Sequence, residues 1–293
     1  MRFGLSGCFL PEDMNDLTVE MCRRVRALGF SGIFTRFRAN DPHTTPREQA
    51  LRVKQLLADE GVTLFQVTGY WQFLISEDEA VRREAVRTLQ AALRLTGWMG
   101  ARGIDTGPGS YHPDGPWWPH PANWTATSRR QLIRSLRECA SAAEEAGVFL
   151  SLEGHPNVTL ESAEVTLEVL QAVNSPWVRS DYDSANWAGL KTIYDTTALI
   201  NHHFDLLGDW IISCHAKDIW PEEQRFSQHL QDGCPGRGKV DFRTLFQRMQ
   251  ALSPEYPVIA EGNTAEELPA VSQLFHRLAS ELNLRVLDTD EHA

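Results

Sequence analysis

The chain has few cysteines, little positive charge and no long apolar segment. Its five cysteines are scattered and form no Cys-x-x-Cys pair, so neither a disulfide scaffold nor a thiolate zinc site is indicated. The formal net charge of −11 argues against a nucleic-acid partner, because proteins that bind phosphate backbones usually carry a basic surface. No stretch is long and apolar enough to span a bilayer, and no signal peptide is recognisable. We therefore expect a cytoplasmic protein with no membrane partner.

The chain is long enough for one large core and shows no sign of division. It has 293 residues, 42% of them hydrophobic, and no Ser/Gly-rich linker. A helical pattern, a glycine and a short apolar strand follow one another repeatedly, as at Gly29, Gly61 and Gly147. A glycine just past a helix is typical of a left-handed C-terminal cap.

Eight strands are predicted, and helical patterns lie between them. The strands begin near Arg2, Gly32, Thr63, Ile104, Phe149, Val178, Ile211 and Pro257. Eight alternations without a composition break predict one domain over residues 1–293, a (β/α)8 TIM barrel of the α/β class. Two long loops, 108–124 and 219–239, follow the fourth and seventh strands and would lie at the catalytic end of such a barrel.

Four of the predicted strands end in a metal-binding type of side chain: Glu153, Asp183, His215 and Glu261. Parallel strands bring these ends together, and strand alternation turns the side chains away from the helix-packing residues. One carboxylate at a strand end is usually an ordinary surface residue, but four in register indicate a site. Three carboxylates and an imidazole suit a hard or borderline divalent ion. Asp181 has the same parity as Asp183, so alternation alone leaves both open.

Several residues near these strand ends have two interpretations. His155 either caps its loop or contacts a ligand, and Lys217 either pairs with a carboxylate or contacts substrate. The segment Gly236–Arg237–Gly238 is a turn or an anion cradle. Arg36 ends the second strand, where it could form a buried ion pair.

Tryptophan is concentrated in the loops that follow the predicted strands. The residues are Trp71, Trp117, Trp118, Trp124, Trp187 and Trp220. Their flat faces suit the apolar face of a sugar ring or a large aglycone. Packing of the loops onto the barrel, or a homo-oligomer interface, explains them equally well.

Five motifs in order make the chain similar to a known superfamily. They are Leu152-Glu153-Gly-His155-Pro156, Asp183-Ser-Ala-Asn186, His215-Ala-Lys217-Asp218, Gly236-Arg-Gly238-Lys-Val-Asp241-Phe242 and Ile259-Ala-Glu261. Over essentially its whole length the chain resembles the xylose isomerase-like barrels, in particular the single-metal sugar isomerases and epimerases. In that family's motif the metal-binding Asp lies three residues before a His or Asn, which favours Asp183 over Asp181.

The resemblance implies a reaction and a set of site residues. It implies one divalent cation, with Mn2+ preferred over Mg2+, Co2+ or Zn2+, held by Glu153, Asp183, His215 and Glu261. It also implies proton transfer through a metal-stabilised enediolate of a small sugar, with Glu153 and Glu261 as the acid–base pair. The residues expected to contact substrate are His155, Asn186, Lys217, Arg237, Trp117 and Trp71.

Two departures from the family leave other reactions open. Asn186 stands where many sugar epimerases carry His, and Pro221 stands where many carry Arg. One alternative is a lyase that dehydrates keto-inositols or cleaves 3-keto-glycosides by elimination. A zinc endonuclease is a weaker alternative because it needs further His and Asp ligands, and a barrel that binds sugar without turnover is another. No cluster of Arg and Lys marks a phosphate pocket, which favours unphosphorylated substrates.

Overall fold

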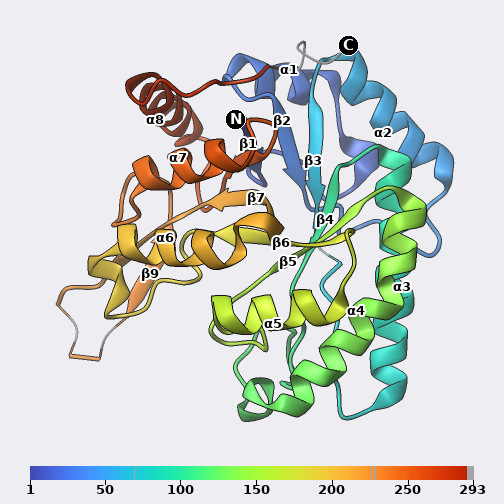
Figure 1. The fold of residues 1–293 in the computed structure, drawn as a ribbon. Coiled ribbons are helices and arrows are strands. Elements are labelled where there is room, and N and C mark those ends of the chain that lie inside the picture. Colours follow the sequence, from blue (N-terminus) through green and yellow to red (C-terminus); the bar gives the residue numbers. More distant parts are fainter. Residues whose placement is uncertain (69, 225, 228, 289–293) are drawn as a thin grey trace.

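A closed barrel of eight parallel strands forms the centre of the molecule (Figure 1). The computed structural model describes residues 1–68, 70–224, 226–227 and 229–288. The barrel strands are β1 (Arg2–Ser6), β2 (Gly32–Thr35), β3 (Thr63–Val67), β4 (Gly103–Thr106), β5 (Phe149–Glu153), β6 (Val178–Asp183), β7 (Ile211–Ala216) and β10 (Pro257–Ala260). β10 pairs with both β7 and β1, and β1 pairs with β2, which closes the ring. The predicted TIM barrel is confirmed, with β4 starting one residue earlier than expected.

Eight α-helices in the described part of the chain surround the barrel. They are α1 (Val19–Ala27), α2 (Arg47–Asp59), α3 (Glu79–Met99), α4 (Ala126–Ala146), α5 (Ala163–Val173), α6 (Thr196–Leu207), α7 (Phe242–Leu252) and α8 (Leu268–Glu281). Asp78, Thr125 and Ser162 accept backbone N–H groups at the starts of α3, α4 and α5. Each such cap stabilises its helix by about 1 kcal/mol. α4 ends at Gly147, whose φ of 65° is the left-handed cap that the sequence predicts.

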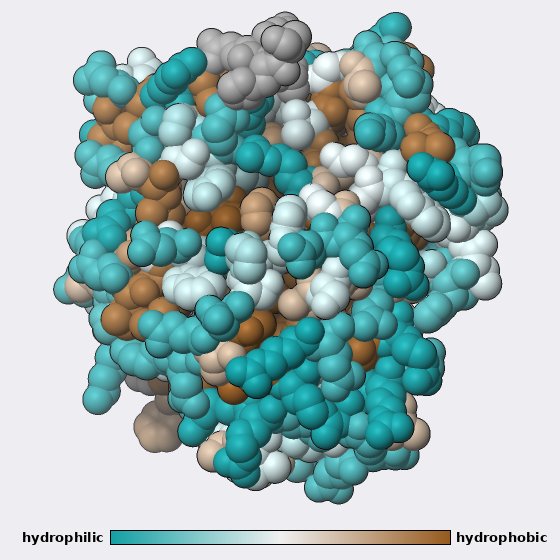
Figure 2. All heavy atoms as spheres, turned by 45° about the vertical axis from the view of Figure 1, so that its right-hand side comes forward, coloured by the Kyte–Doolittle hydropathy of each residue, from teal (hydrophilic) through white to brown (hydrophobic). Residues whose placement is uncertain are grey.

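Each helix buries one apolar stripe against the barrel and turns its charged side outward. On α3, Leu89, Ala92 and Leu95 are fully buried, and each buried leucine contributes about 1.5–3 kcal/mol. Figure 2 brings the side of α2, α3 and α4 forward, and hydrophilic side chains cover much of it. None of the helices in the described ranges combines the length and the apolar character needed to cross a membrane.

The second long loop contains structure that the sequence does not predict. Within 219–239 the chain forms a two-stranded antiparallel sheet of β8 (Asp218–Pro221) and β9 (Leu230–Gly233), which projects from the barrel in Figure 1. The prediction of a plain loop is therefore wrong. Only Lys217 separates β8 from β7, so no glycine or proline between them marks where one strand ends and the next begins.

Candidate active site and metal centre

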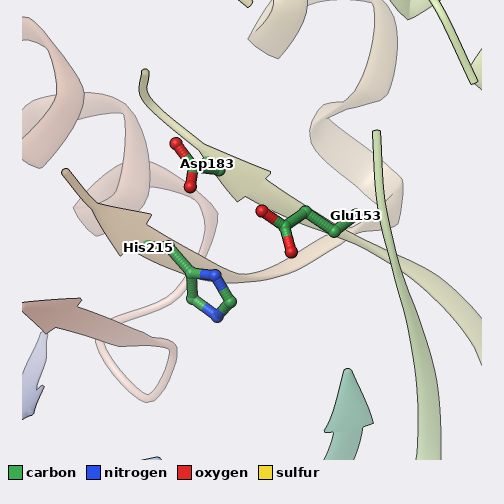
Figure 3. A group of neighbouring side chains, drawn as sticks. All are labelled: Glu153, Asp183 and His215. Carbon is green, nitrogen blue, oxygen red and sulfur yellow. The ribbon is translucent and has the colours of Figure 1, made fainter. Parts of the chain in front are cut away.

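Three of the four predicted metal ligands converge at the carboxyl ends of neighbouring strands. Glu153 ends β5, Asp183 ends β6 and His215 lies near the end of β7. One ligand atom from each lies within 4.8 Å of the others, and Figure 3 shows the side chains turned toward one another. In the described part of the chain this is the one cluster of His, Cys, Asp and Glu side chains close enough to share a cation.

Glu261, the fourth predicted ligand, lies beside this cluster. It directly follows β10, and its Oε2 is 3.1 Å from Nδ1 of His215. Its Oε1 is 2.6 Å from Nη2 of Arg36, at the end of β2. The ion pair expected for Arg36 is thus present, and it orients the carboxylate that the sequence assigns to acid–base chemistry.

Side chains of the barrel interior contact His215 on the side away from the pocket. Its Nε2 lies 3.0 Å from Oδ2 of Asp181 and 3.1 Å from Oε1 of Gln66. Its ring also packs on Phe34, with 4.7 Å between centroids. Burial alone would lower the pKa of His215, but Asp181 and Glu261 outweigh it and raise this pKa well above its ordinary value, so both ring nitrogens donate. With a cation at the site, Nδ1 would give up its proton and bind the cation, while Nε2 would keep its proton toward Asp181 and Gln66.

The two aspartates of β6 have different surroundings. Oδ1 of Asp183 accepts the backbone N–H groups of Ala185 at 2.7 Å and Asn186 at 3.1 Å, and its Oδ2 is 3.1 Å from Nζ of Lys217. Asp181 instead contacts the far nitrogen of His215 and accepts a 2.6 Å hydrogen bond from Gln66. Asp183 therefore belongs to the cluster, and Asp181 supports the histidine.

The donor atoms fit a divalent cation. Three buried atoms at this point have ion-pair contacts but no well-aligned hydrogen bond within the described chain: Oδ2 of Asp183, Nδ1 of His215 and Oε2 of Glu261. Poorly satisfied buried polar atoms are costly, and a cation would satisfy all three. Carboxylate oxygens with one imidazole nitrogen are ligands suited to Mn2+, Mg2+, Co2+ or Zn2+.

The surroundings of the two glutamates shift their pKa values in opposite directions. Burial, together with the negative charge of Asp105, raises the pKa of Glu153 well above its ordinary value. Burial alone would also raise the pKa of Glu261, but the charges of His215, Lys217 and Arg36 outweigh it and hold this pKa below its usual range. Pairs of carboxyl groups with separated pKa values are typical of acid–base sites.

A pocket of about 470 Å³ opens beside the cluster and contains most of the predicted substrate contacts. Its lining includes Trp71, Trp117, Glu153, His155, Asn186, Lys217 and Glu261. Asn186 donates a 2.6 Å hydrogen bond to Oε1 of Glu153, and its Oδ1 is 3.4 Å from Nζ of Lys217. Burial lowers the pKa of His155, and its Nδ1 accepts the N–H of Asn157.

Arg237 does not line this pocket. Its guanidinium lies 3.4 Å from Glu267 and over the ring of Trp220, 5.3 Å from the centroid. Gly236 and Gly238 donate their N–H groups to Oδ2 of Asp218. Of the two interpretations of this glycine segment, the structure therefore shows the turn and not the anion cradle.

Sequence reasoning missed two polar residues of the barrel interior. Gln66 donates to Asp181 and to Ser213, and Asp105 is buried with a pKa raised to about 7, mainly by burial. Both interrupt short apolar strands, which is the signal that could have found them. Asp232, on β9, also lines the pocket and is 3.4 Å from Nζ of Lys217.

Fold and site together define a parallel (β/α)8 barrel with a carboxylate–histidine cluster at its catalytic end. The model of the xylose isomerase-like TIM barrel family matches residues 22–279, and the chain belongs to this family. A relative from Shigella dysenteriae serotype 1, which bears the name L-ribulose-5-phosphate 3-epimerase UlaE, is 25% identical over 230 residues, covering 75% of this chain and 72% of its own.

Two solved structures share the fold at low identity. D-Psicose 3-epimerase with D-tagatose, from Clostridium cellulolyticum H10, has a TM-score of 0.71 at 16% identity, covering 97% of this chain and 100% of its own. A xylose isomerase-like TIM barrel protein from Mycobacterium smegmatis, in complex with magnesium, has a TM-score of 0.68 at 15% identity, covering 96% of each chain. The match of the family model over residues 22–279 confirms the family predicted from the motifs, and these two structures confirm the fold.

Proposed function

We propose that this protein is a sugar isomerase or epimerase that depends on one divalent cation. The observation that carries the proposal is the convergence of Glu153, Asp183 and His215 within 4.8 Å, with Glu261 beside them, next to a pocket of about 470 Å³. Family membership and the epimerase names of a relative and a structural neighbour support a small sugar as substrate. Mn2+ is the preferred cation, with Mg2+, Co2+ and Zn2+ as alternatives.

Glu153, Asp183, His215 and Glu261 would hold the cation. When bound, it would neutralise the negative charge that develops on the sugar oxygens when the neighbouring carbon loses its proton. The partly compensated charges of Arg36 and Lys217 add fixed positive charge near the same place.

The two glutamates are placed to move the proton. Asn186 holds Glu153 through Oε1, and Arg36 holds Glu261 through Oε1, so each carboxylate has a fixed direction. One of the two carboxylates would remove the proton from the carbon, and the other would return it. The reverse reaction exchanges these roles.

Two further groups can bind the hydroxyls of the sugar. The ring of neutral His155 accepts from Asn157 at Nδ1, which leaves an N–H at Nε2 to donate into the pocket. Nζ of Lys217 contacts Asp183, Asp232 and Asn186, so it would bind an oxygen of the substrate in exchange for one of its two 3.4 Å contacts.

The test is solvent-deuterium incorporation measured by NMR across ketoses, keto-inositols and 3-keto-glycosides with added Mn2+. We expect exchange at the carbon beside the carbonyl and a fall of roughly 10²–10⁴ in its rate for Glu261→Gln. Glu164→Gln, an exposed α5 residue paired with His202, is the matched control and should exchange at the wild-type rate. Equal rates in wild type and Glu261→Gln would overturn the assignment.

A lyase is the second candidate, because the pocket has aromatic walls beyond the glutamates that could hold a leaving group. The same proton abstraction then ends in elimination. Release of water or of a glycosidic fragment in the deuterium experiment would favour the lyase, whereas exchange with retention of all groups favours the epimerase.

A further inference from the structure

We propose that the pocket takes an uncharged glycoside whose sugar ring carries a keto group, with this ring beside the glutamates and an apolar or aromatic substituent against Trp71, Trp117 and Trp118. This inference rests on the proposed function and specifies its substrate class. It depends on two independent features of the pocket, namely its charge balance and its aromatic wall.

Each cation in the described pocket lining is already paired with a carboxylate. Arg36 lies 2.6 Å from Glu261, and Nζ of Lys217 lies 3.1 Å from Asp183 and 3.4 Å from Asp232. Four carboxylates surround the two cations: Glu153, Asp183, Asp232 and Glu261. A divalent ion would bring this group close to neutrality, so a phosphate dianion would find no uncompensated positive charge.

The glycine segment after β9 offers no phosphate cradle either. Oδ2 of Asp218 accepts the N–H groups of Gly236 at 2.9 Å and Gly238 at 2.7 Å, while its Oδ1 accepts that of Val240 at 3.0 Å. Clustered backbone N–H groups are a common way to bind phosphate. In this protein the buried carboxylate of Asp218 already accepts these N–H groups, so none of the three is available to a phosphate.

The aromatic wall is built by two loops. Trp71 follows β3 and meets Trp117, from the loop after β4, edge to face with 6.1 Å between centroids. Gly107 and Gly115 make room for the indoles, since a Cβ at either glycine would lie 2.5 Å from Trp117 or Trp118 respectively. The side chain of Trp118 is 53% exposed, which leaves a flat apolar surface at the pocket.

Buried hydrogen bonds fix this wall before any ligand arrives. Asn123, which is fully buried, donates to the carbonyls of Trp118 at 3.2 Å and Asn157 at 2.9 Å, and accepts the N–H of Tyr111 at 3.0 Å. The loop after β4 is thereby tied to the loop after β5. A preformed aromatic surface binds a planar substituent with little ordering cost.

Apolar residues outside the aromatic wall also line the pocket. The loop after β6 and the β8–β9 sheet contribute Ala188, Ile219 and Leu230, while Asn157 and Asp232 add polar groups. A volume of about 470 Å³ is within the range of roughly 300–1,000 Å³ that is typical of drug-sized ligands, which are larger than one sugar ring. The pocket therefore has room and apolar contacts for a substituent beyond a single sugar.

The experiment is calorimetric binding to Mg2+-loaded protein, because binding does not depend on turnover. The probes are phenyl and methyl β-D-glucosides and β-D-galactosides, with D-glucose and D-glucose 6-phosphate. We expect each phenyl glycoside to bind at least tenfold more tightly than its methyl counterpart, and the phosphate ester no more tightly than glucose. Trp118→Ala should remove the phenyl preference while keeping methyl glycoside binding. The control Trp210→Ala, at the opposite end of β7, should retain the preference.

A gain of function tests the charge argument. Asp232→Asn removes one of the two carboxylates paired with Lys217, so glucose 6-phosphate should gain severalfold in affinity relative to glucose. Equal binding of phenyl and methyl glycosides, no binding of any glycoside, or tighter binding of the phosphate ester by the wild type would each overturn the inference. Deuterium exchange on free ketoses would still support the proposed function in those cases.

Discussion

Substitution of Asp181 by Asn should weaken metal binding although Asp181 is not among the proposed ligands. Oδ2 of Asp181 lies 3.0 Å from Nε2 of His215 and favours the tautomer that leaves Nδ1 free. An asparagine amide can present its NH2 group to Nε2, which moves the ring proton to Nδ1 and blocks the lone pair that faces Glu261. Loss of such a supporting carboxylate typically reduces metal affinity by about 10–100-fold, or about 1.4–2.7 kcal/mol.

The assay is calorimetric titration of the apo protein with Mn2+ at fixed pH, with thermal unfolding to verify that each variant is folded. Ser213→Ala is the matched control, because it removes a 2.9 Å hydrogen bond from Gln66 in the same interior network without touching His215. Mn2+ affinity of Asp181→Asn within twofold of wild type would refute the reasoning. An equal loss in Ser213→Ala would refute it too, since the effect would then come from the network as a whole.

Two further outcomes are expected. Mn2+ affinity should rise with pH, because the raised pKa of Glu153 makes a proton compete with the cation, and a titration series whose affinity is flat from acidic to neutral pH would contradict this. Gly154→Ala should lower the free energy of unfolding by about 1–3 kcal/mol, since its Cβ would lie 2.2 Å from the ring of Trp187. A Cβ at Gly147 would meet no atom within 4 Å. Gly147→Ala should therefore lower the free energy of unfolding only by the strain of a left-handed backbone, about 1–2 kcal/mol. Urea unfolding of both variants measures these free energies, and an unchanged free energy of unfolding for Gly154→Ala would contradict the packing argument.

Polar side chains of several strands meet in the barrel interior beneath the site. Gln66 links Ser213 on β7 and Asp181 on β6, while His215 sits directly above them. Strand alternation puts such residues inside the barrel, and this alternation is visible in sequence. The roles assigned to the site residues remain predictions that the experiments above test.

Some contacts of the site could not be predicted from local sequence patterns, because they join residues that are far apart in the chain. Arg36 and Glu261 are separated by 225 residues and meet only because β2 and β10 flank β1 in the closed barrel. Arg237 looked equally suited to substrate, but the turn around Asp218 directs it to Glu267 instead.

The sequence by itself determined the barrel and which residues stand at the strand ends, because apolar periodicity and helix-ending glycines are local properties of the chain. Strand alternation could not rank Asp181 against Asp183, since it fixes the side of a strand on which a residue lies but not its depth in the barrel, and only the likeness to the family motif favoured Asp183. The tertiary structure decided this through a register shift between β6 and β7 at Ser180 and Asp181. That shift pairs Asp183 directly with His215, so the upper aspartate joins the cluster and the lower one supports the histidine.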